Sequence, residues 1–290
     1  MTILLTGASG LLGRAVLREL RGAGYTVVAV AGRRKVDDQT VLANLADPAA
    51  LAALPTKAEC IIHLAAFVPE HEREVNPELT FPANALATLN LLEFAARHEI
   101  RNFVYGSSCS VYGHWPSNSP LREEEEVHPT DFYAASKLDG EVLTLPYGFF
   151  YRLSVKILRF SYIYGMGMRR STAVCTFVDL ARQGRPLPLF NEGRDRMDPL
   201  YVKDAAAAVL AAVGAGEGVF NIGSGGTISV RELAETIIRV TGSPSTLEFR
   251  PSAGSPRTAF MQIEKARADL GWRPSYDLEA GIRDFLSEYA

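Results

Sequence analysis

Three glycines near the N-terminus constrain the fold of this chain more than any other feature. Gly7, Gly10 and Gly13 follow a short apolar strand pattern and open a helical pattern that runs through Arg21. Small residues at this spacing let the backbone turn sharply and approach a pyrophosphate, whose charge is stabilised at a helix N-terminus. The spacing predicts a dinucleotide-binding turn, and a glycine-rich turn without a ligand is the alternative. The contacts expected here are Gly7, Ser9, Gly10, Leu11, Leu12 and Gly13.

A basic turn follows the second predicted strand. In a fold of this kind, an acidic residue about 20 residues after the glycines would hold the ribose 2′-hydroxyl of NAD. Ala31 occupies that place, and Arg33 and Arg34 follow it. Arginine presents a planar fork that suits a phosphate, so the pattern favours NADP (NADPH). A solvated basic turn is the alternative, and NAD stays possible because Asp37 or Asp38 could bind a ribose.

Further apolar runs have the continuous pattern of parallel strands that are buried on both faces. They are Cys60 to Leu64, Asn102 to Gly106 and Ser154 to Arg159. A lone histidine inside such a strand, His63, is more often structural than catalytic. Residues next to these strands are expected to contact the dinucleotide, and Asn44 and Leu45 are expected to reach its adenine. The complete set is Asn44, Leu45, Leu64, Ala65, Ala66 and Phe160.

Tyr133 and Lys137 are separated by one helical turn, so both side chains can point into one cleft. An adjacent cation favours a phenolate, and we expect Lys137 to lower the pKa of the Tyr133 phenol toward neutral pH. A surface helix that happens to carry both residues is the alternative. The helix is predicted to run to about Leu143 and to end at Pro146. A second long helix is predicted over Pro82 to His98.

Serines follow the strand that ends at Gly106, at the sheet edge where ligands of open parallel sheets bind. A serine hydroxyl at this edge can donate to a substrate carbonyl oxygen and oppose the charge that develops during hydride transfer. The polar loop that follows, His114 to Asp131, has a length typical of loops that cover active sites. Its acidic run, Glu123 to Glu126, is expected to be solvated.

Composition excludes several classes of protein. The 290 residues carry a net charge of -3 and no strongly basic stretch, which argues against a nucleic-acid-binding surface. The N-terminal residues show neither a signal peptide nor a membrane span, so we expect a cytoplasmic protein with no membrane partner. Three cysteines without short spacings indicate reduced thiols and no metal site.

The pattern changes after Gly165, and this change defines the predicted domains. We expect a doubly wound parallel sheet of the Rossmann type, flanked by helices, over residues 1–165 with a return segment at about 195–223. A smaller, mostly helical substrate lobe is expected over residues 166–194 and 224–290. In this lobe, Ser229 and Glu232 indicate a capping box at the start of a helix.

With these segments identified, the chain resembles the extended short-chain dehydrogenase/reductase family. The likeness is to its branch of NAD(P)-dependent nucleotide-sugar epimerases, dehydratases and 4-ketoreductases, and it extends over nearly the whole chain. The matching segments are Thr6 to Gly13, Ile62 to Ala66, Ser107 to Gly113, Tyr133 to Lys137, Tyr201 to Asp204, Asn221 to Gly223 and Leu270 to Pro274. The resemblance also implies a homodimer formed through the helices near 82–98 and 131–145.

The resemblance implies catalytic roles for Ser108, Tyr133 and Lys137. Tyr133 would exchange a proton with the substrate oxygen, Ser108 would hold that oxygen, and Lys137 would hold the nicotinamide ribose. Family dehydratases carry an acidic pair where this chain has Cys109 and Ser110, which makes dehydration a poor expectation. The residues expected at the substrate are Phe67, Ser108, Cys109, Ser110, Tyr162 and Arg196.

Two further departures from the family affect the substrate site. Tyr162 replaces an expected asparagine, and Met197 replaces the arginine that grips a nucleotide diphosphate in the family. Arg194 or Arg196 is the candidate to replace that contact, and a substrate without a diphosphate is the alternative.

The sequence favours an NADPH-dependent ketoreductase of a nucleotide-linked 4-keto-6-deoxyhexose. Arg33 and Arg34 in place of an acid, and the missing dehydratase acids, support this expectation. An NAD-dependent nucleotide-sugar 4-epimerase with the same three residues is the first alternative. A catalytically silent, dinucleotide-sensing regulatory protein is the second.

Overall fold

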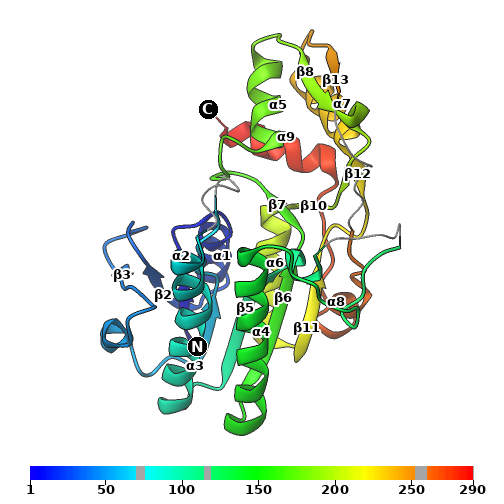
Figure 1. Cartoon of the computed structure of the whole chain (residues 1–290). Coiled ribbons are helices and arrows are strands. Elements are labelled where there is room, and N and C mark those ends of the chain that lie inside the picture. The colour runs from blue at the N-terminus through cyan, green and yellow to red at the C-terminus, as the bar shows by residue number, and fades with distance from the viewer. Residues whose placement is uncertain (70–75, 114–118, 252–259, 290) are drawn as a thin grey trace.

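The structure is a computed structural model that describes residues 1–69, 76–113, 119–251 and 260–289. Its larger part is a seven-stranded parallel sheet in the order β11-β6-β5-β4-β1-β2-β3, flanked by helices (Figure 1). This confirms the predicted doubly wound parallel sheet. The strands are β1 (Thr2–Thr6), β2 (Thr26–Ala31), β3 (Val41–Leu42), β4 (Cys60–His63), β5 (Asn102–Ser108), β6 (Ser154–Phe160) and β11 (Gly218–Ile222).

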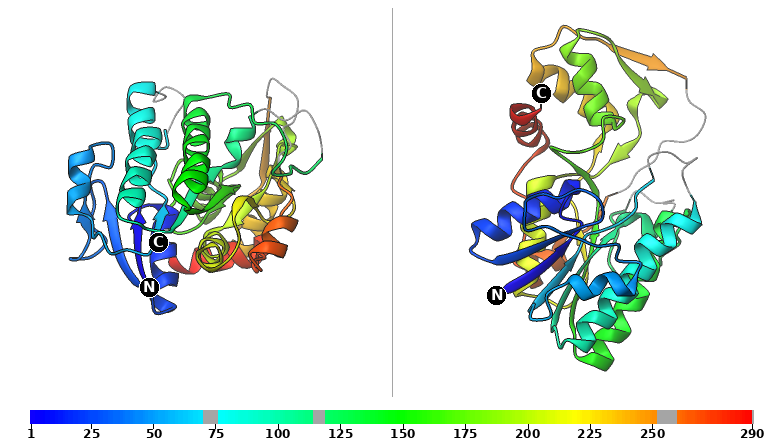
Figure 2. Two further views of the ribbon diagram at one scale, coloured as in Figure 1. Left: turned by 90° about the horizontal axis from the view of Figure 1, so that it is seen from below. Right: turned by 90° about the vertical axis from the view of Figure 1, so that its left-hand side faces the viewer.

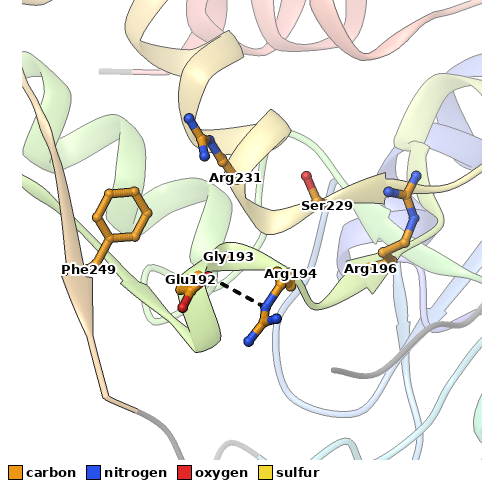
Figure 3. Close-up of a pocket in the computed structure, with 7 residues that line it drawn as sticks. All are labelled: Glu192, Gly193, Arg194, Arg196, Ser229, Arg231 and Phe249. Carbon is orange, nitrogen blue, oxygen red and sulfur yellow. Dashed lines mark ion pairs between the residues drawn. The ribbon is translucent and has the colours of Figure 1, made fainter. Parts of the chain in front are cut away.

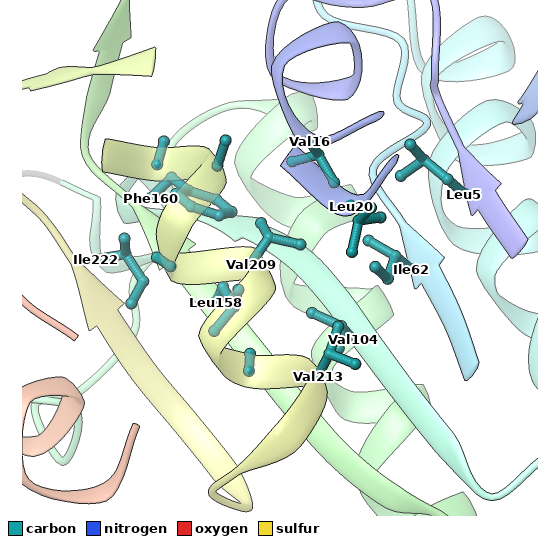
Figure 4. Packing of buried hydrophobic residues seen from close by; sticks show 14 of the residues in the cluster. Leu5, Val16, Leu20, Ile62, Val104, Leu158, Phe160, Val209, Val213 and Ile222 are labelled. Carbon is teal, nitrogen blue, oxygen red and sulfur yellow. The ribbon is translucent and has the colours of Figure 1, made fainter. Parts of the chain in front are cut away.

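Both faces of the sheet are covered, which explains the continuous apolar strand runs. Successive side chains of a strand alternate between faces. Ile3 and Leu5 of β1 pack with α1 (Leu11–Gly22) and α6 (Val202–Gly214) on one face (Figure 4). Leu4 packs on the opposite face, where α3 (Ala87–Arg97) and α4 (Phe132–Tyr151) lie.

The helical stretch predicted from Pro82 begins earlier. Asn76 caps α2 (Pro77–Phe81) by accepting a hydrogen bond from the Glu78 N–H at 2.8 Å. Proline at the first helical position suits this start, because its missing N–H would have no helical partner there. Pro82 then opens a π-helical turn, η3 (Pro82–Leu86), which leads into α3. The predicted start was wrong because the Asn76–Pro77 start signal was overlooked.

Pro146 does not end α4, which continues to Tyr151. Proline removes one helical hydrogen bond, to the carbonyl group of Val142. Val142 lies on the exposed face of the helix, where water can satisfy that carbonyl. The helix ends instead at Arg152, whose left-handed conformation (φ 53°) stops it.

The smaller lobe stands above the carboxyl ends of the sheet strands (Figures 1 and 2). Its helices share one apolar core with a short parallel pair of strands. Other short strands, β7 with β10 and β9 with β12, form separate pairs. The elements are β7 (Tyr162–Tyr164), α5 (Ala173–Arg182), β8 (Leu187–Phe190), β9 (Arg196–Met197), β10 (Pro199–Tyr201), β12 (Ile228–Ser229), α7 (Val230–Thr241), β13 (Leu247–Arg250) and α9 (Leu278–Glu288).

The C-terminal half contributes to both lobes. Helix α8 (Glu264–Asp269) packs against β11, and Ile263, Leu270 and Trp272 lie in the core of the sheet. These residues fall within the range that we assigned to the substrate lobe. The predicted capping box at Ser229 and Glu232 is confirmed at the start of α7.

Glu123 is not a purely solvated residue, in contrast to the prediction. Its carboxylate accepts a hydrogen bond from the Asn221 N–H of the edge strand β11 at 2.9 Å, whereas Glu124, Glu125 and Glu126 are exposed. An edge strand has backbone groups that lack a neighbouring strand, and Glu123 satisfies one of them.

Membrane-spanning helices, metal clusters and disulfides are absent from the part of the chain that the structure describes. Across residues 1–69, 76–113, 119–251 and 260–289, no helix is long and apolar enough to cross a membrane. The same residues hold no cluster of three or more His, Cys, Asp or Glu side chains suited to a metal ion. The cysteines at 60, 109 and 175 are free thiols.

Candidate active site

The glycine turn packs against the loop that follows β4. Gly7 has a φ of +72°, and a Cβ atom there would lie 2.6 Å from the Ala65 nitrogen. A Cβ atom on Gly13 would lie 2.0 Å from the Gly7 oxygen. Only glycine therefore permits this close approach of β1, α1 and β4. Thr6, Gly7, Leu64 and Ala65, all within the predicted dinucleotide segments, lie together here.

The start of α1 fits a dinucleotide pyrophosphate. Its N-cap residue is Gly10, no side chain of the described residues caps it, and its first turn carries no acidic residue. Backbone N–H groups at a helix start without a cap can donate to phosphate oxygens, and the helix dipole adds favourable charge. The glycine cradle and the uncapped helix therefore suit the group that the sequence predicts.

Further predicted cofactor residues lie in the turn after β2 and in the loop after β3. Arg33 and Arg34 are exposed in the turn after β2. Asp37, which we considered for the ribose, pairs with Arg21 at 2.5 Å and accepts a hydrogen bond from Thr40. The loop after β3 is held by Asn90, whose side chain donates to the Leu45 carbonyl at 2.9 Å.

His63 has a structural role, as predicted. The Thr88 hydroxyl donates to the Asn84 carbonyl and so accepts the proton of His63 Nε2 at 3.0 Å. His63 Nδ1 then accepts a hydrogen bond from the Thr6 hydroxyl at 2.7 Å, which fixes the tautomer. Burial and the nearby Lys137 charge lower the pKa of His63 to about 3, so the ring is neutral.

Ser108 and Tyr133 meet at the carboxyl end of β5. Ser110 donates from its hydroxyl to Ser108 Oγ at 2.9 Å, and Ser108 lies close enough to the Tyr133 phenol to lower its pKa. Asp131 caps α4 by accepting a hydrogen bond from the Ala134 N–H at 2.7 Å, which places Tyr133 in the first turn. The serine loop and the start of α4 thus bring two predicted catalytic groups together.

The pKa of the Tyr133 phenol is not lowered, in contrast to the prediction. Burial raises it to about 12, although the Ser108 hydrogen bond and the Arg169 charge oppose this effect. Burial also lowers the pKa of Lys137 to about 8. The Lys137 ammonium lies 4.7 Å from the centre of the Tyr105 ring. The expectation failed because spacing along a helix reveals two neighbours but not the loss of water around them.

A buried ion pair lies behind the serine loop. Arg159 Nη2 of β6 lies 2.7 Å from Glu141 Oε2 of α4, and both side chains are almost fully buried. The Ser107 hydroxyl donates to the same carboxylate at 2.5 Å. Glu141 also follows Lys137 by one helical turn, and its charge favours the ammonium. We did not predict this pair, although an arginine inside an apolar strand is a signal for a buried partner.

Asn84 is a second residue that the sequence analysis missed. Its side chain accepts a hydrogen bond from the Phe67 N–H at 2.7 Å and donates to the Phe67 carbonyl at 3.1 Å. The same amide donates to Ser136 Oγ of α4 at 2.8 Å. Asn84 is buried within the π-helical turn, and such turns often mark functional sites.

Some predicted substrate residues lie near a buried carboxyl group, Asp198. The Asp198 carbonyl accepts a hydrogen bond from the Tyr162 N–H at 3.2 Å, and its carboxyl group accepts hydrogen bonds from the Ser224 N–H and hydroxyl. Burial and the Asp198 charge raise the pKa of the Cys109 thiol to about 12. Cys109 is therefore a neutral thiol beside Ser108 and is unsuited to act as an acid or base at neutral pH.

Arg196 lies in a different place, in a pocket of about 590 Å³ in the smaller lobe (Figure 3). Its guanidinium donates to the Thr227 carbonyl at 2.8 Å and lies 3.8 Å from Glu232. Among the described residues, those lining this pocket include no predicted catalytic residue. The lining residues are Glu192, Gly193, Arg194, Arg196, Ser229, Arg231 and Phe249.

Four matches relate this chain to known proteins. A model of the "NAD dependent epimerase/dehydratase family" matches residues 3–223. The UDP-glucose 4-epimerase of Mycolicibacterium smegmatis is 32% identical over 302 residues, 97% of this chain and 96% of that protein. The crystal structure of a UDP-glucose 4-epimerase from Thermotoga maritima with UDP-glucose has a TM-score of 0.91 at 26% identity and covers 100% of this chain and 98% of that chain. A Thermus thermophilus UDP-glucose 4-epimerase in complex with NAD has a TM-score of 0.88 at 25% identity, over 99% of this chain and 98% of that chain.

These matches confirm the resemblance inferred from the sequence. They support the 4-epimerase alternative better than the ketoreductase that we expected first. The Thermus protein was solved with NAD, so the preference for NADP inferred from Arg33 and Arg34 has no support from this neighbour.

Proposed function

The chain belongs to the NAD dependent epimerase/dehydratase family, and on that premise we propose that it is a nucleotide-sugar 4-epimerase that uses NAD. One observation carries the proposal: Ser108 lies beside the Tyr133 phenol on a chain that matches a UDP-glucose 4-epimerase over nearly its full length. Lys137 follows Tyr133 by one turn, and the glycine cradle suits a dinucleotide.

The proposed reaction inverts the C4 hydroxyl group of the sugar through a 4-keto sugar. Bound NAD would supply a reversible acceptor for the C4 hydride, which the keto sugar would take back on the opposite face of its ring. Ser108 holds the C4 oxygen by a hydrogen bond, and Tyr133 removes its proton in the first half and returns it in the second. Because its pKa is raised to about 12, the Tyr133 phenol suits the protonating half. The Ser108 hydrogen bond and the Arg169 charge favour the phenolate that the first half requires.

A direct test is the conversion of UDP-glucose to UDP-galactose by the purified protein, followed by nuclear magnetic resonance. Replacement of Tyr133 by Phe should lower turnover by about 10²–10⁴-fold, the usual contribution of a general acid or base. Tyr151→Phe, at the far end of the same helix, is the matched control and should leave turnover unchanged. No conversion of any UDP- or dTDP-linked hexose by the unmodified protein would exclude the epimerase.

An NADPH-dependent ketoreductase of a keto-sugar is the second candidate. The exposed Arg33 and Arg34 in the turn after β2, and the Asp37 carboxylate already paired with Arg21, favour it. Replacing both exposed arginines with Ala should weaken NADPH binding at least tenfold and leave NAD binding unchanged if this candidate is correct. Tightly retained NAD in the purified protein would favour the epimerase instead.

We also propose that two copies of the chain associate through α4 and its neighbours. Val142, Leu145 and Phe149 form an apolar stripe on α4 and are 60%, 49% and 82% exposed. Leu79 and Leu86 lie exposed on the adjacent α2 and η3, which contact α4. Light scattering should report a dimer, and Val142→Glu with Leu145→Glu should give a monomer.

A further inference from the structure

We propose that Arg169 is a positioning residue that fastens the smaller lobe to the loop after β4 and, through it, holds the first turn of α4. The proposal rests on the role of Tyr133 given above, since this turn carries the phenol. Arg169 lies between β7 and α5, about 100 residues from its partners in the sequence.

The guanidinium of Arg169 spans the two lobes. Its Nη1 donates to the Pro69 carbonyl at 2.8 Å, and its Nη2 donates to the Val68 carbonyl. The two donors of one planar fork thus hold two consecutive carbonyl groups, which a lysine ammonium cannot match in geometry. The Arg169 carbonyl accepts hydrogen bonds from the Thr172 hydroxyl at 2.8 Å and from the Thr172 N–H at 3.2 Å. Because Thr172 is the N-cap of α5, the arginine is anchored at the start of a helix.

A chain of hydrogen bonds continues from this contact to the catalytic helix. Phe67 precedes Val68, and its N–H and carbonyl are both bound by the Asn84 side chain. Asn84 then donates to Ser136, whose hydroxyl donates to the Tyr133 carbonyl at 2.8 Å. Asn84 and Ser136 are buried, so water cannot replace a hydrogen bond that either side chain loses. Breaking one of these bonds would leave a buried polar group without a partner, which is costly. A continuous series of hydrogen bonds therefore connects the smaller lobe to the turn that carries Tyr133, and its buried members cannot exchange their partners for water.

The charge of Arg169 acts on the same phenol. It lowers the pKa of Tyr133 against the effect of burial, so the guanidinium lies within electrostatic range of the phenol oxygen. Arg169 thus influences Tyr133 in two ways, through the hydrogen-bonded loop and through its charge. Its replacement should disturb both the binding of a substrate between the lobes and the chemical step.

The neighbouring arginine provides a matched control. Arg170 lies 3.3 Å from the Asp179 carboxylate and stacks over the Tyr289 ring at 4.2 Å. Both of these contacts are within the smaller lobe. Arg170→Ala therefore removes the same charge and volume one residue away and leaves the Arg169 hydrogen bonds to Val68 and Pro69 in place.

The experiment compares Arg169→Ala, Arg169→Lys and Arg170→Ala with the unmodified protein in two measurements. Amide hydrogen exchange of the segments 61–69 and 131–137, without substrate, reports the loop and the helix turn directly. We expect Arg169→Ala to speed exchange in both segments at least tenfold and Arg170→Ala to leave it unchanged. Steady-state kinetics with the nucleotide sugar should show KM raised about tenfold and kcat lowered severalfold in Arg169→Ala, since small displacements of reacting groups have large rate effects. Arg169→Lys should keep much of kcat, because the charge stays, but not the low KM.

A fourth variant tests the hydrogen-bonded connection itself. Ser136→Ala breaks the connection between Asn84 and α4 while leaving Arg169 in place. If these hydrogen bonds transmit the effect of Arg169 on the first turn of α4, Ser136→Ala already removes it. Ser136→Ala and the double variant Ser136→Ala with Arg169→Ala should then show similar amide exchange at residues 131–137. Unchanged exchange at 61–69 and 131–137 in Arg169→Ala would overturn the proposal. Altered exchange together with no turnover of any nucleotide sugar by the unmodified protein would overturn the proposed function and leave the positioning role intact.

Discussion

Charged side chains gather in two regions, the carboxyl edge of the sheet and the pocket of the smaller lobe that Arg194, Arg196 and Arg231 line, which we call the arginine pocket. The two regions differ in how far water reaches these charges. At the sheet edge, Glu141 and Arg159 are 3% and 7% exposed and lie 2.7 Å apart. In the pocket, Glu192 and Arg194 are 70% and 60% exposed and lie 3.8 Å apart. Water and salt screen the second pair, whereas the first pair is almost fully shielded from both. Burial, not the number of charges, should decide which region depends on them.

The largest expected effect concerns the buried ion pair. Replacement of Glu141 by Leu leaves the Arg159 charge buried without its carboxylate and should lower the free energy of unfolding by about 3–5 kcal/mol. Urea unfolding measures this loss. The double variant Glu141→Leu with Arg159→Met should be less destabilised than the single variant, because no unpaired charge stays buried.

The exposed Glu235 is the matched control for this experiment. It pairs with Arg231 at 2.8 Å, a distance close to that of the buried pair. Glu235→Leu should change the free energy of unfolding by about 1 kcal/mol or less. Equal losses in Glu141→Leu and Glu235→Leu would contradict the contrast between the two regions.

Lys137 should make the free energy of unfolding rise with pH in the alkaline range. Burial lowers its pKa to about 8, so between pH 8 and its ordinary pKa of 10.5 the unfolded chain binds more protons than the folded chain. The free energy of unfolding should therefore gain about 2 kcal/mol from this group as the pH rises from 7 to 9.5. Lys137→Met should remove that gain, and exposed Lys57→Met should retain it. Parallel pH profiles of the unmodified protein and Lys137→Met would show that the ammonium is not buried.

His63 should have the corresponding effect at acidic pH. Its pKa falls from 6.5 to about 3 on folding, so the unfolded chain binds an extra proton between these values. The stability from this group is present above pH 6.5 and is lost as the pH falls, by about 1.5 kcal/mol at pH 5.5. The difference in unfolding free energy between the unmodified protein and His63→Gln should shrink by this amount from pH 7.5 to 5.5. The exposed His128→Gln serves as the control, and a difference that does not change with pH would contradict the neutral, buried ring.

The smallest effects are expected in the arginine pocket. Arg194→Ala or Arg196→Ala should each change the free energy of unfolding by about 0.5 kcal/mol, and added salt should reduce that change. Thermal unfolding at low and high salt measures it. If either variant lost as much unfolding free energy as Glu141→Leu, these exposed pairs would stabilise the fold as strongly as the buried pair. The distinction between the two regions would then be wrong.

Much of the fold and part of the site followed from local patterns. Continuous apolar runs located the long sheet strands, and the glycine spacing located the turn between β1 and α1. The helical Tyr133–Lys137 motif and the serines after β5 identified Tyr133 and Ser108, which the structure places side by side. These features are readable because each depends on neighbours in the sequence.

Predictions from local sequence patterns failed where exposure or burial in the folded chain outweighed the pattern. Pro146 stays within α4 at a place where the preceding turn is exposed, so that water can replace the lost helical hydrogen bond. Lys137 does not bring the Tyr133 phenol to neutral pKa, because burial of both groups outweighs their proximity. The choice between ketoreductase and epimerase was biased by Arg33 and Arg34, whose exposed position at a turn is compatible with either dinucleotide.

The sequence by itself determined the parallel sheet, the glycine turn and the spacing of Tyr133 and Lys137 by one helical turn, because strand hydrophobicity, glycine backbone freedom and helical spacing act over a few residues. Only the tertiary structure decided the partners of Glu141, Asn84 and Arg169, which come from segments 17 to 101 residues away. Hydrogen bonds and ion pairs of this kind depend on which segments the fold brings into contact and on how much water it removes. Neither quantity is encoded at any one position of the chain.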